Sequence, residues 1–487
     1  MVSGTVFSFG ALIVGRFATI VNSIIIVRVL GFFNLGILSI VVLTTSVANL
    51  FATFGVPASM VKFLAEIPAD RPEEASSLLG AGFAITLATT SLTLIALALV
   101  SPVLSSLYAA PAVASLLLVA SLGVVLNSVP SPISATFQAF ELVRQLATRN
   151  IASAILSVPA TVVLVVLWGL NGAVWAAVLN AGIATFVNIT FIRRIWRPRE
   201  LSLEIPSKSA VYRKVLSYSV PAFVGSVLVT PVLWFANTYL ATRSSFAEVG
   251  KYSVAFGLAN YLLFIPAAIG VPLIPIVSRM GRFKPHEFQP FLTKAIRVSG
   301  FLLILPTLVL FAFPEAFLDL LYGAGAAAAA QIVRVLALAV FLAGLSTTVG
   351  GGIAGTGRMW EGLLLNLIWG AVLVFMTLIL VPGQSGLGLA FSYLIAYMVH
   401  FSSILVYIKE RWSVDIREVS APVAIMSAAI GVVVLLNTLV ADALRSIMVL
   451  GLLIAVVAIE RALMTSREIE VLSEPIRRFV RWISQTV

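Results

Sequence analysis

The chain consists largely of apolar segments, each long enough to cross a lipid bilayer. Fourteen such segments occur, each near the roughly 20 residues that a helix needs to span about 30 Å of hydrocarbon. They cover residues 5–29, 35–55, 78–100, 112–136, 150–169, 171–192, 215–240, 250–275, 295–313, 331–354, 361–381, 386–408, 420–440 and 446–464. They lack the alternation of apolar and polar residues that marks barrel strands. The sequence therefore predicts an all-α polytopic membrane protein with about fourteen transmembrane helices.

The composition excludes most soluble classes of protein. Of the 487 residues, 60% are hydrophobic and only 10% are charged, whereas a soluble protein carries roughly 25% charged residues. With no cysteine there is no disulfide or thiolate metal site, and His286 and His400 are too far apart in the sequence to suggest a metal centre. A phosphate-binding Walker loop is also missing, so no ATP site is visible. We therefore expect no enzyme activity, no cofactor and no metal.

The basic residues predict the orientation in the membrane. Of the 31 Lys and Arg residues, 25 fall on one side of the predicted helices. Because Lys and Arg stay in the cytoplasm, we expect both termini to be cytoplasmic. The net charge of +11 then reflects cytoplasmic loops and not nucleic-acid binding. The basic tail, 465–487, carries bulky apolar residues and suits a helix on the inner leaflet; an ordinary positive-inside tail is the alternative.

An internal repeat organises the predicted helices. Three local sequences resemble segments 214 residues later: Phe32–Ser39 and Phe246–Ser253, Tyr108–Ala110 and Tyr322–Ala324, and Asn171–Ala173 and Ser385–Leu387. The shift maps the first six segments onto the next six. Because six is even, the two halves enter the membrane with the same orientation, which is the parallel-repeat arrangement.

This repeat predicts five regions along the chain. They are an N-lobe (1–192), a basic cytoplasmic linker (193–214), a C-lobe (215–408), two extra helices (409–464) and a basic amphipathic cytoplasmic tail (465–487). The fold class is thus two parallel six-helix lobes plus two additional C-terminal helices. The substrate path is expected between the lobes.

Short motifs at the helix junctions resemble those of a known family. Arg28–Gly36, Phe54–Phe63 and Ala354–Arg358 are similar to junction sequences of polysaccharide and oligosaccharide flippases, in the multidrug/oligosaccharidyl-lipid/polysaccharide exporter superfamily. The likeness covers the first twelve segments as a pattern of lengths and turns. It implies two six-helix lobes around a central cavity. It also implies alternating access that moves a lipid-linked sugar from the inner to the outer leaflet.

Polar residues in the first segment are candidates for binding an anionic headgroup. Arg16 lies about halfway along segment 5–29, and Asn22 and Arg28 follow at intervals of six residues. An arginine at membrane depth is costly unless it faces protein or water, so we expect Arg16 in the cavity. The alternatives are that Arg16 reaches the cytoplasmic headgroups and that Arg28 only stabilises the adjoining turn. Lipid II flippases resemble this segment but carry an arginine where this chain has Asn22.

In the second lobe, Asn237, Tyr252 and Asn260 are candidates for contacting the sugar. Amides, hydroxyls and aromatic faces suit sugars, which offer hydroxyls at the rim and C–H groups on the ring face. Hydrogen bonds between helices are the alternative role of each residue. Arg334 is a candidate for helping a phosphate to leave, or else an anchor near a loop.

The acidic residues separate the candidate functions. None of the 20 lies near the middle of a predicted span, whereas ion-driven exporters need an intramembrane group that changes charge. Arginine without such a carboxylate favours an anion such as a phosphate or pyrophosphate. We therefore expect a monomeric plasma-membrane or inner-membrane flippase for an oligosaccharide on a polyprenyl or dolichyl phosphate or pyrophosphate, with glycosyltransferases or a glycan polymerase as partners. The alternatives are a cation-coupled multidrug efflux carrier and a polytopic glycan polymerase.

Overall fold

The all-α fold expected from the sequence is confirmed. The computed structural model describes residues 2–68, 70–267, 273, 277–278, 285–323, 325–439 and 442–463, and throughout these ranges the chain forms helices joined by turns, with no strand. The amphipathic tail predicted at 465–487 lies outside the described residues. Contacts divide the chain into two compact units, Met1–Gly250 and Lys251–Val487. The division at the basic linker 193–214 stays a prediction.

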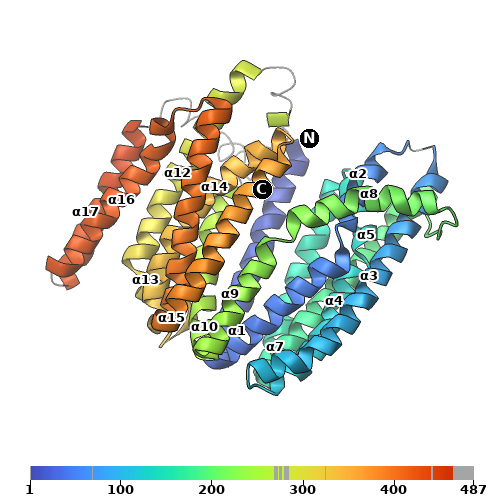
Figure 1. The fold of residues 1–487 in the computed structure, drawn as a ribbon, viewed down its shortest axis with the longest axis horizontal. Helices are drawn as coiled ribbons and strands as arrows, with labels where there is room; N and C mark the ends of the chain where they lie inside the picture. Colours follow the sequence, from blue (N-terminus) through green and yellow to red (C-terminus); the bar gives the residue numbers. More distant parts are fainter. Residues whose placement is uncertain are drawn as a thin grey trace, which may run out of the picture. The chain divides into compact units, whose positions relative to one another are not determined.

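The first unit is a bundle built around two long bent helices. Its elements are α1 (Val2–Thr53), α2 (Val56–Glu66), α3 (Pro72–Leu107), α4 (Ala112–Ser128), α5 (Ser131–Ser134), α6 (Thr136–Ala139), α7 (Val143–Trp196), η1 (Arg197–Arg199), α8 (Ser209–Ser226), α9 (Val229–Arg243) and the start of α10 (Phe246–Asn260). Helices α1, α3, α4 and α7 pack side by side (Figure 1), α8 packs on α2 and α3, and α9 packs on α1.

The second unit packs around α12, α14 and α15. After the end of α10 it contains η2 (Tyr261–Leu263), α12 (Pro285–Ala312), α13 (Pro314–Tyr322), η3 (Ala326–Ala329), α14 (Ala330–Gly355), α15 (Met359–Trp412), α16 (Ile416–Leu439) and α17 (Asp442–Leu463). Helix α14 packs against both α12 and α15, while α16 and α17 pack against α12 and against each other. The two helices predicted outside the repeat are therefore attached through α12.

Nine helices of the described residues are long and apolar enough to cross a membrane. Three of the longest, α1, α7 and α15, each join two predicted segments across one residue with non-helical dihedral angles: Gly31, Gly169 and Ser385. Large apolar side chains such as Leu99 (70%) remain exposed, as expected of a surface that faces lipid. The number of fourteen membrane crossings stays a prediction.

Two predicted segments are interrupted in the structure. Segment 215–240 is broken between Ser226, where α8 ends, and Val229, where α9 begins. Segment 112–136 ends its regular helix at Ser128, immediately before Pro130 and Pro132, and continues as the short helices α5 and α6. Proline cannot donate to the helical ladder, and hydropathy alone does not locate such breaks. Segment 250–275 is described continuously only to residue 267.

The extended part of the basic linker packs closely on α3. The backbone N–H of Ser202 donates to Ser76 Oγ at 3.0 Å. At Gly80 the approach is closer still, since a Cβ there would lie 1.9 Å from the carbonyl oxygen of Glu204. Gly80 therefore has room only for a hydrogen, and the linker is held against α3.

The first sequence correspondence of the repeat is also a reciprocal backbone contact. A Cβ at Gly36 would lie 1.8 Å from the carbonyl oxygen of Phe246, and a Cβ at Gly250 would lie 1.9 Å from the carbonyl oxygen of Phe32. Gly36 and Gly250 are equivalent under the shift of 214 residues, and so are Phe32 and Phe246. The two helices thus cross with local two-fold pseudosymmetry, at a distance that only glycine permits. The ring of Phe33 meets that of Phe246 edge to face at 5.8 Å.

The repeat changes register by two residues further along the chain. The second correspondence keeps the shift of 214, because the residues after the matched tyrosines, Ala109 and Gly323, both have positive φ. The third is wrong by two: the bend at Gly169 (φ 54°, ψ −125°) matches Ser385 (φ 52°, ψ −129°), 216 residues later. The sequence match paired Gly172 with Gly386, whereas the register of the bends pairs Gly172 with Gly388, where an added Cβ would in both cases meet the carbonyl oxygen eight residues earlier.

Candidate functional site

The first segment places its three candidate residues in different surroundings. Arg16 and Arg28 are exposed on α1, whereas Asn22 is half-buried and faces α7. The Asn22 Nδ2 group donates to Ser157 Oγ at 3.4 Å, and the buried Asn22 Oδ1 atom has no hydrogen-bond partner among the described residues. One amide therefore links α1 to α7 and keeps an unused acceptor. Binding of a headgroup by these three residues stays a prediction.

The candidates of the proposed second lobe are divided between the two compact units. Asn237 is buried on α9 within the first unit, and its Nδ2 group donates to its own helix at Leu233 O (2.9 Å). Asn260 does the same on α10, where its Nδ2 group donates to Phe256 O at 2.8 Å. Both side-chain amides thus donate a hydrogen bond within their own helix. Their contact with a sugar stays a prediction.

Tyr252 belongs to a buried aromatic cluster in the second unit. Its ring stacks on Phe256 at 5.7 Å, and Phe256 meets Tyr393 at 5.4 Å. The cluster continues through Trp369 and Tyr397, as the Tyr393 and Tyr397 rings are 4.9 Å apart and Trp369 lies 5.7 Å from Tyr397. The Trp369 indole N–H is buried without a partner among the described residues.

Sequence reasoning did not single out the α15 members of this aromatic cluster. The available signal was the spacing of Tyr393, Tyr397 and His400, which places all three side chains on one helix face. His400 is buried and its Nδ1 atom lies 3.1 Å from the Leu365 carbonyl oxygen. That contact gives His400 a packing role within α15.

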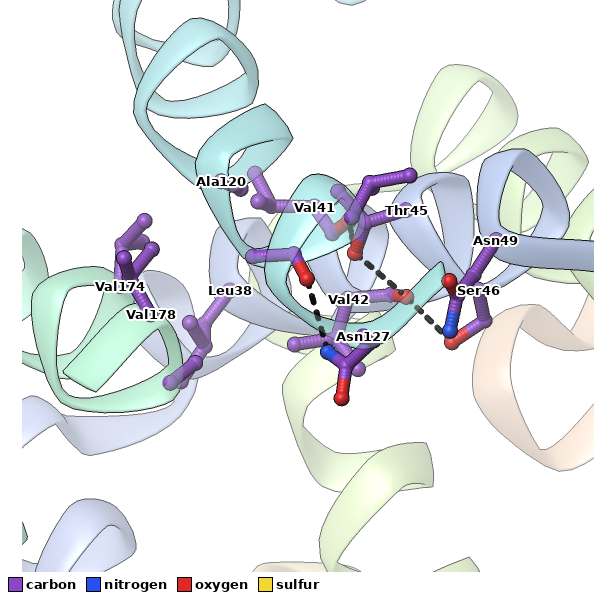
Figure 2. A pocket seen from close by; sticks show the side chains of 13 residues that line it. Leu38, Val41, Val42, Thr45, Ser46, Asn49, Ala120, Asn127, Val174 and Val178 are labelled. Atoms are coloured by element: carbon purple, nitrogen blue, oxygen red, sulfur yellow. Dashed lines mark hydrogen bonds between the residues drawn. The ribbon is translucent and has the colours of Figure 1, made fainter. Parts of the chain in front are cut away.

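A cavity of about 150 Å³ lies among α1, α4 and α7 in the first unit (Figure 2). Its polar side chains are Thr45, Ser46, Asn49 and Asn127, in a wall that is otherwise aliphatic. Ser46 and Asn127 donate to carbonyl groups of their own helices, while Asn49 Oδ1 is buried without a partner among the described residues. The sequence signal for this cavity was an asparagine in each of two apolar segments, 35–55 and 112–136.

A second cavity of about 430 Å³ lies among α1, α3 and α9 and is almost wholly apolar. Its polar link is the Trp234 indole N–H, which donates to Thr44 Oγ1 at 2.9 Å. Nearby in sequence, Thr238 Oγ1 lies 2.8 Å from the Tyr108 hydroxyl, joining α9 to the end of α3. Burial raises the pKa of Tyr108, so this hydroxyl stays protonated at neutral pH.

The carboxylates of the described residues lie towards helix ends and not inside the bundles. No Asp or Glu is buried among the side chains that the structure describes. Glu361, at the start of α15, accepts from Tyr407 and pairs with Arg358 (3.3 Å) and Arg411 (3.6 Å). In the described part of the chain, no group of three His, Cys, Asp or Glu residues suits a metal ion.

Arg334 on α14 is held by an acidic partner. Its Nη2 atom lies 2.7 Å and 2.9 Å from the two carboxylate oxygens of Glu315 on α13. This pairing fits the anchoring role that the sequence left open. Because the guanidinium is already neutralised, it is less available to a departing phosphate.

We expect the Arg334–Glu315 pair to behave as a structural anchor. Arg334→Gln and Glu315→Gln should each lower the melting temperature, and the double variant should cost no more than the worse single one. A double-mutant cycle should give a coupling of about 0.5–1 kcal/mol, because both side chains are partly exposed. Thermal unfolding of detergent-purified protein measures it. Loss of transport in Arg334→Gln but not in Glu315→Gln would contradict an anchoring role.

Comparison with known proteins places the chain in a family. Residues 1–281 match the family model described as polysaccharide biosynthesis protein. The EPS I polysaccharide export inner membrane protein EpsE of Ralstonia solanacearum is 23% identical over 420 residues, covering 82% of this chain and 92% of that protein. EpsE of Ralstonia nicotianae is 26% identical over 197 residues, covering 39% and 45% of the two chains.

Two solved structures share the fold at low sequence identity. The lipid II flippase MurJ in an inward closed conformation superposes with a TM-score of 0.73 at 13% identity, covering 94% of this chain and 98% of that one. An inward-facing multidrug resistance MATE family transporter of the MOP superfamily gives a TM-score of 0.68 at 13% identity, with 83% and 98% covered. The chain therefore belongs to the polysaccharide biosynthesis protein family.

Proposed function

We propose that this protein flips a lipid-linked oligosaccharide from the cytoplasmic to the outer leaflet of the inner or plasma membrane, for assembly of a surface polysaccharide or glycoprotein. The observation that carries the proposal is the charge pattern. Cationic side chains, Arg16 and Arg28, lie on α1, while no described Asp or Glu side chain is buried. An anionic phosphate or pyrophosphate carrier suits such a path better than a cation does.

The proposed mechanism is alternating access between two six-helix lobes. Arg16 draws the phospho-sugar headgroup into the cavity, helped by the unused acceptor of Asn22 and by Arg28 at the outer mouth. Asn237, Tyr252 and Asn260 contact the sugar, and the lipid tail stays in the bilayer while the lobes rock outward. The similarity to EpsE, named for polysaccharide export, and to MurJ, named for flipping lipid II, supports this assignment.

The remaining parts of the proposal concern topology and partners. Both termini face the cytoplasm, with the linker 193–214 joining the lobes there, as the distribution of Lys and Arg predicts. The protein acts as a monomer, supplied by glycosyltransferases inside and drained by a glycan polymerase outside. The net charge of +11 comes from cytoplasmic basic residues that face the anionic inner leaflet. It does not serve to bind nucleic acid.

A cation-coupled efflux carrier is the second candidate, since MATE transporters share the fold. Coupling to an ion needs a membrane carboxylate that changes charge. The two functions are distinguished by whether lipid-linked glycan accumulates in cells that lack the protein.

A deletion strain tests the proposed function directly. Carrier lipids are extracted and the sidedness of the sugar-charged form is determined with a membrane-impermeant reagent. We expect complete lipid-linked glycan to accumulate on the cytoplasmic leaflet while surface glycan is lost, and the wild-type gene should restore both. Normal surface glycan with raised sensitivity to cationic dyes would contradict flipping and support efflux. Short unpolymerised units on the outer face would indicate a polymerase.

A further inference from the structure

Arg149 occupies an unusual place near the start of α7. Helix α7 begins at Val143, so Arg149 lies six residues, or ~9 Å, inside it. Its side chain is half-buried and its guanidinium lies over the Phe137 ring, 5.6 Å from the ring centre. From sequence alone this arginine counts only as one of the cytoplasmic loop cations, because the apolar segment starts at residue 150.

Two asparagines hold the guanidinium in one orientation. Arg149 Nη1 donates to Asn188 Oδ1 at 2.9 Å, from the other arm of the bent helix α7. Arg149 Nε and Nη2 donate together to Asn150 Oδ1 at 3.2 Å and 2.8 Å. Asn188 is itself buried, with only 7% of its surface exposed. The two neutral amides orient the guanidinium group without neutralising its charge.

No carboxylate of the described residues balances this charge. Within the described residues Arg149 has no acidic partner at ion-pair distance, in contrast to Arg334 beside Glu315 and Arg297 beside Glu418. Arginine remains protonated in proteins, so the half-buried site keeps a full positive charge. An uncompensated cation at this depth is unfavourable unless an anion can approach it.

The guanidinium also keeps donors for such an anion. An arginine has N–H groups to spare after the three bonds to the asparagines, and the unused ones are on the terminal nitrogens Nη1 and Nη2. Terminal N–H groups of this kind match two phosphate oxygens. Close by, Trp196 packs on the same apolar cluster as Phe137, and its indole N–H is buried without a partner among the described residues.

We propose that Arg149, oriented by Asn150 and Asn188 and backed by Phe137, binds the phosphate of a lipid-borne phosphate ester at the cytoplasmic boundary of the first unit. The inference rests on the proposed function and extends it, because it adds a phosphate site that the first segment of the chain does not contain. Two sources share this chemistry: the isoprenoid carrier of the sugar and the phospholipids of the bilayer. The site receives the phosphate before the headgroup enters the cavity.

Ligand binding to the full-length purified protein tests the site. Geranylgeranyl diphosphate is the carrier probe, geranylgeraniol is its uncharged control, and phosphatidylglycerol represents bilayer lipid. Affinities are measured by native mass spectrometry and by ligand-induced thermal stabilisation. We expect Arg149→Gln to weaken binding of the diphosphate about 10- to 100-fold, the loss typical of a charge-assisted contact. Geranylgeraniol binding should not change.

Two matched variants complete the test. Arg194→Gln removes the same charge from the opposite end of α7, where the side chain is exposed, and should alter diphosphate binding by less than about twofold. Arg149→Lys should retain only part of the affinity, because an ammonium group cannot bind two phosphate oxygens in the planar, bidentate geometry of a guanidinium. Equal affinity for phosphatidylglycerol would support the phosphate site and assign it to bilayer lipid.

The opposite results would overturn the inference. If Arg149→Gln lowers the melting temperature but leaves the diphosphate affinity unchanged, Arg149 only clamps the two arms of α7. If Arg194→Gln weakens binding as much, attraction is a general effect of net charge. Neither result touches the flippase proposal, which depends on carrier-lipid sidedness in the deletion strain and not on this binding assay.

Discussion

Alanine at Gly36 is expected to destabilise the protein more than any other single added methyl group on α1. The new Cβ would lie 1.8 Å from the Phe246 carbonyl oxygen, so the two helix backbones must separate. Overpacking of this kind costs about 1–3 kcal/mol, and here the obstacle is backbone, which cannot rotate away. Gly250→Ala should have a similar effect through Phe32. Thermal unfolding monitored by fluorescence size exclusion measures both.

The control is the same substitution where space is open. Gly15 on α1 and Gly257 on α10 have no atom within 4 Å of the added Cβ. Gly15→Ala and Gly257→Ala should be neutral or stabilising by about 0.5–1 kcal/mol, because alanine favours the helix. The double variant Gly36→Ala/Gly250→Ala should cost less than the sum of the singles, since one displacement relieves both clashes. Additive losses would contradict a single reciprocal crossing.

Alanine at Arg16 is expected to abolish most transport while leaving the fold intact. Arg16 is exposed on α1, so its removal creates no cavity. If it binds the carrier phosphate, losing a charge-assisted hydrogen bond of about 1.5–3 kcal/mol should reduce flux roughly 10- to 150-fold. Arg16→Lys should keep part of the activity because the charge remains. Surface glycan per cell, normalised to membrane expression, is the measurement.

Arg71→Ala is the matched control for Arg16. Arg71 is also exposed, carries the same charge, and its side chain forms an ion pair with Glu74 at 3.9 Å. Surface glycan should remain within about twofold of wild type, as expected for an exposed ion pair. Unchanged glycan in Arg16→Ala at equal expression would show that Arg16 is not a headgroup ligand, and the search would move to the other cations of the first unit.

The sequence predicted the fold class because lipid leaves few alternatives. Inside hydrocarbon every backbone group needs an internal partner, so run lengths of about 20 apolar residues are enough to predict helices. The same runs indicated the bends at Gly31 and Gly169 as junctions between segments. The repeat was also visible, since Gly36 and Gly250 must be glycine for the crossing to form.

The sequence did not locate the break at Ser226–Val229 or the two-residue register change at Ser385. The first lies inside the apolar run 215–240, whose hydropathy does not mark the break. The second lies between the predicted segments 361–381 and 386–408, where the sequence indicated a junction but not its register. Whether an apolar run continues as one straight helix also depends on neighbouring helices, which come from distant parts of the chain. Helix propensity and hydropathy are local quantities, so they carry no information on this packing.

The candidate site divides in the same way. Residue type alone indicated arginines on α1 and the scarcity of intramembrane carboxylates, because charge at membrane depth is costly whatever the packing. Only the tertiary structure showed that Asn22 meets Ser157 and that Arg334 is neutralised by Glu315. It also showed that Arg149 is held by Asn188, 39 residues away, with no acidic partner among the described residues. The free energy of transferring a side chain from water into the membrane depends on its own chemistry, which is known from the sequence. Whether a buried charge is compensated depends on which distant side chain the fold brings beside it.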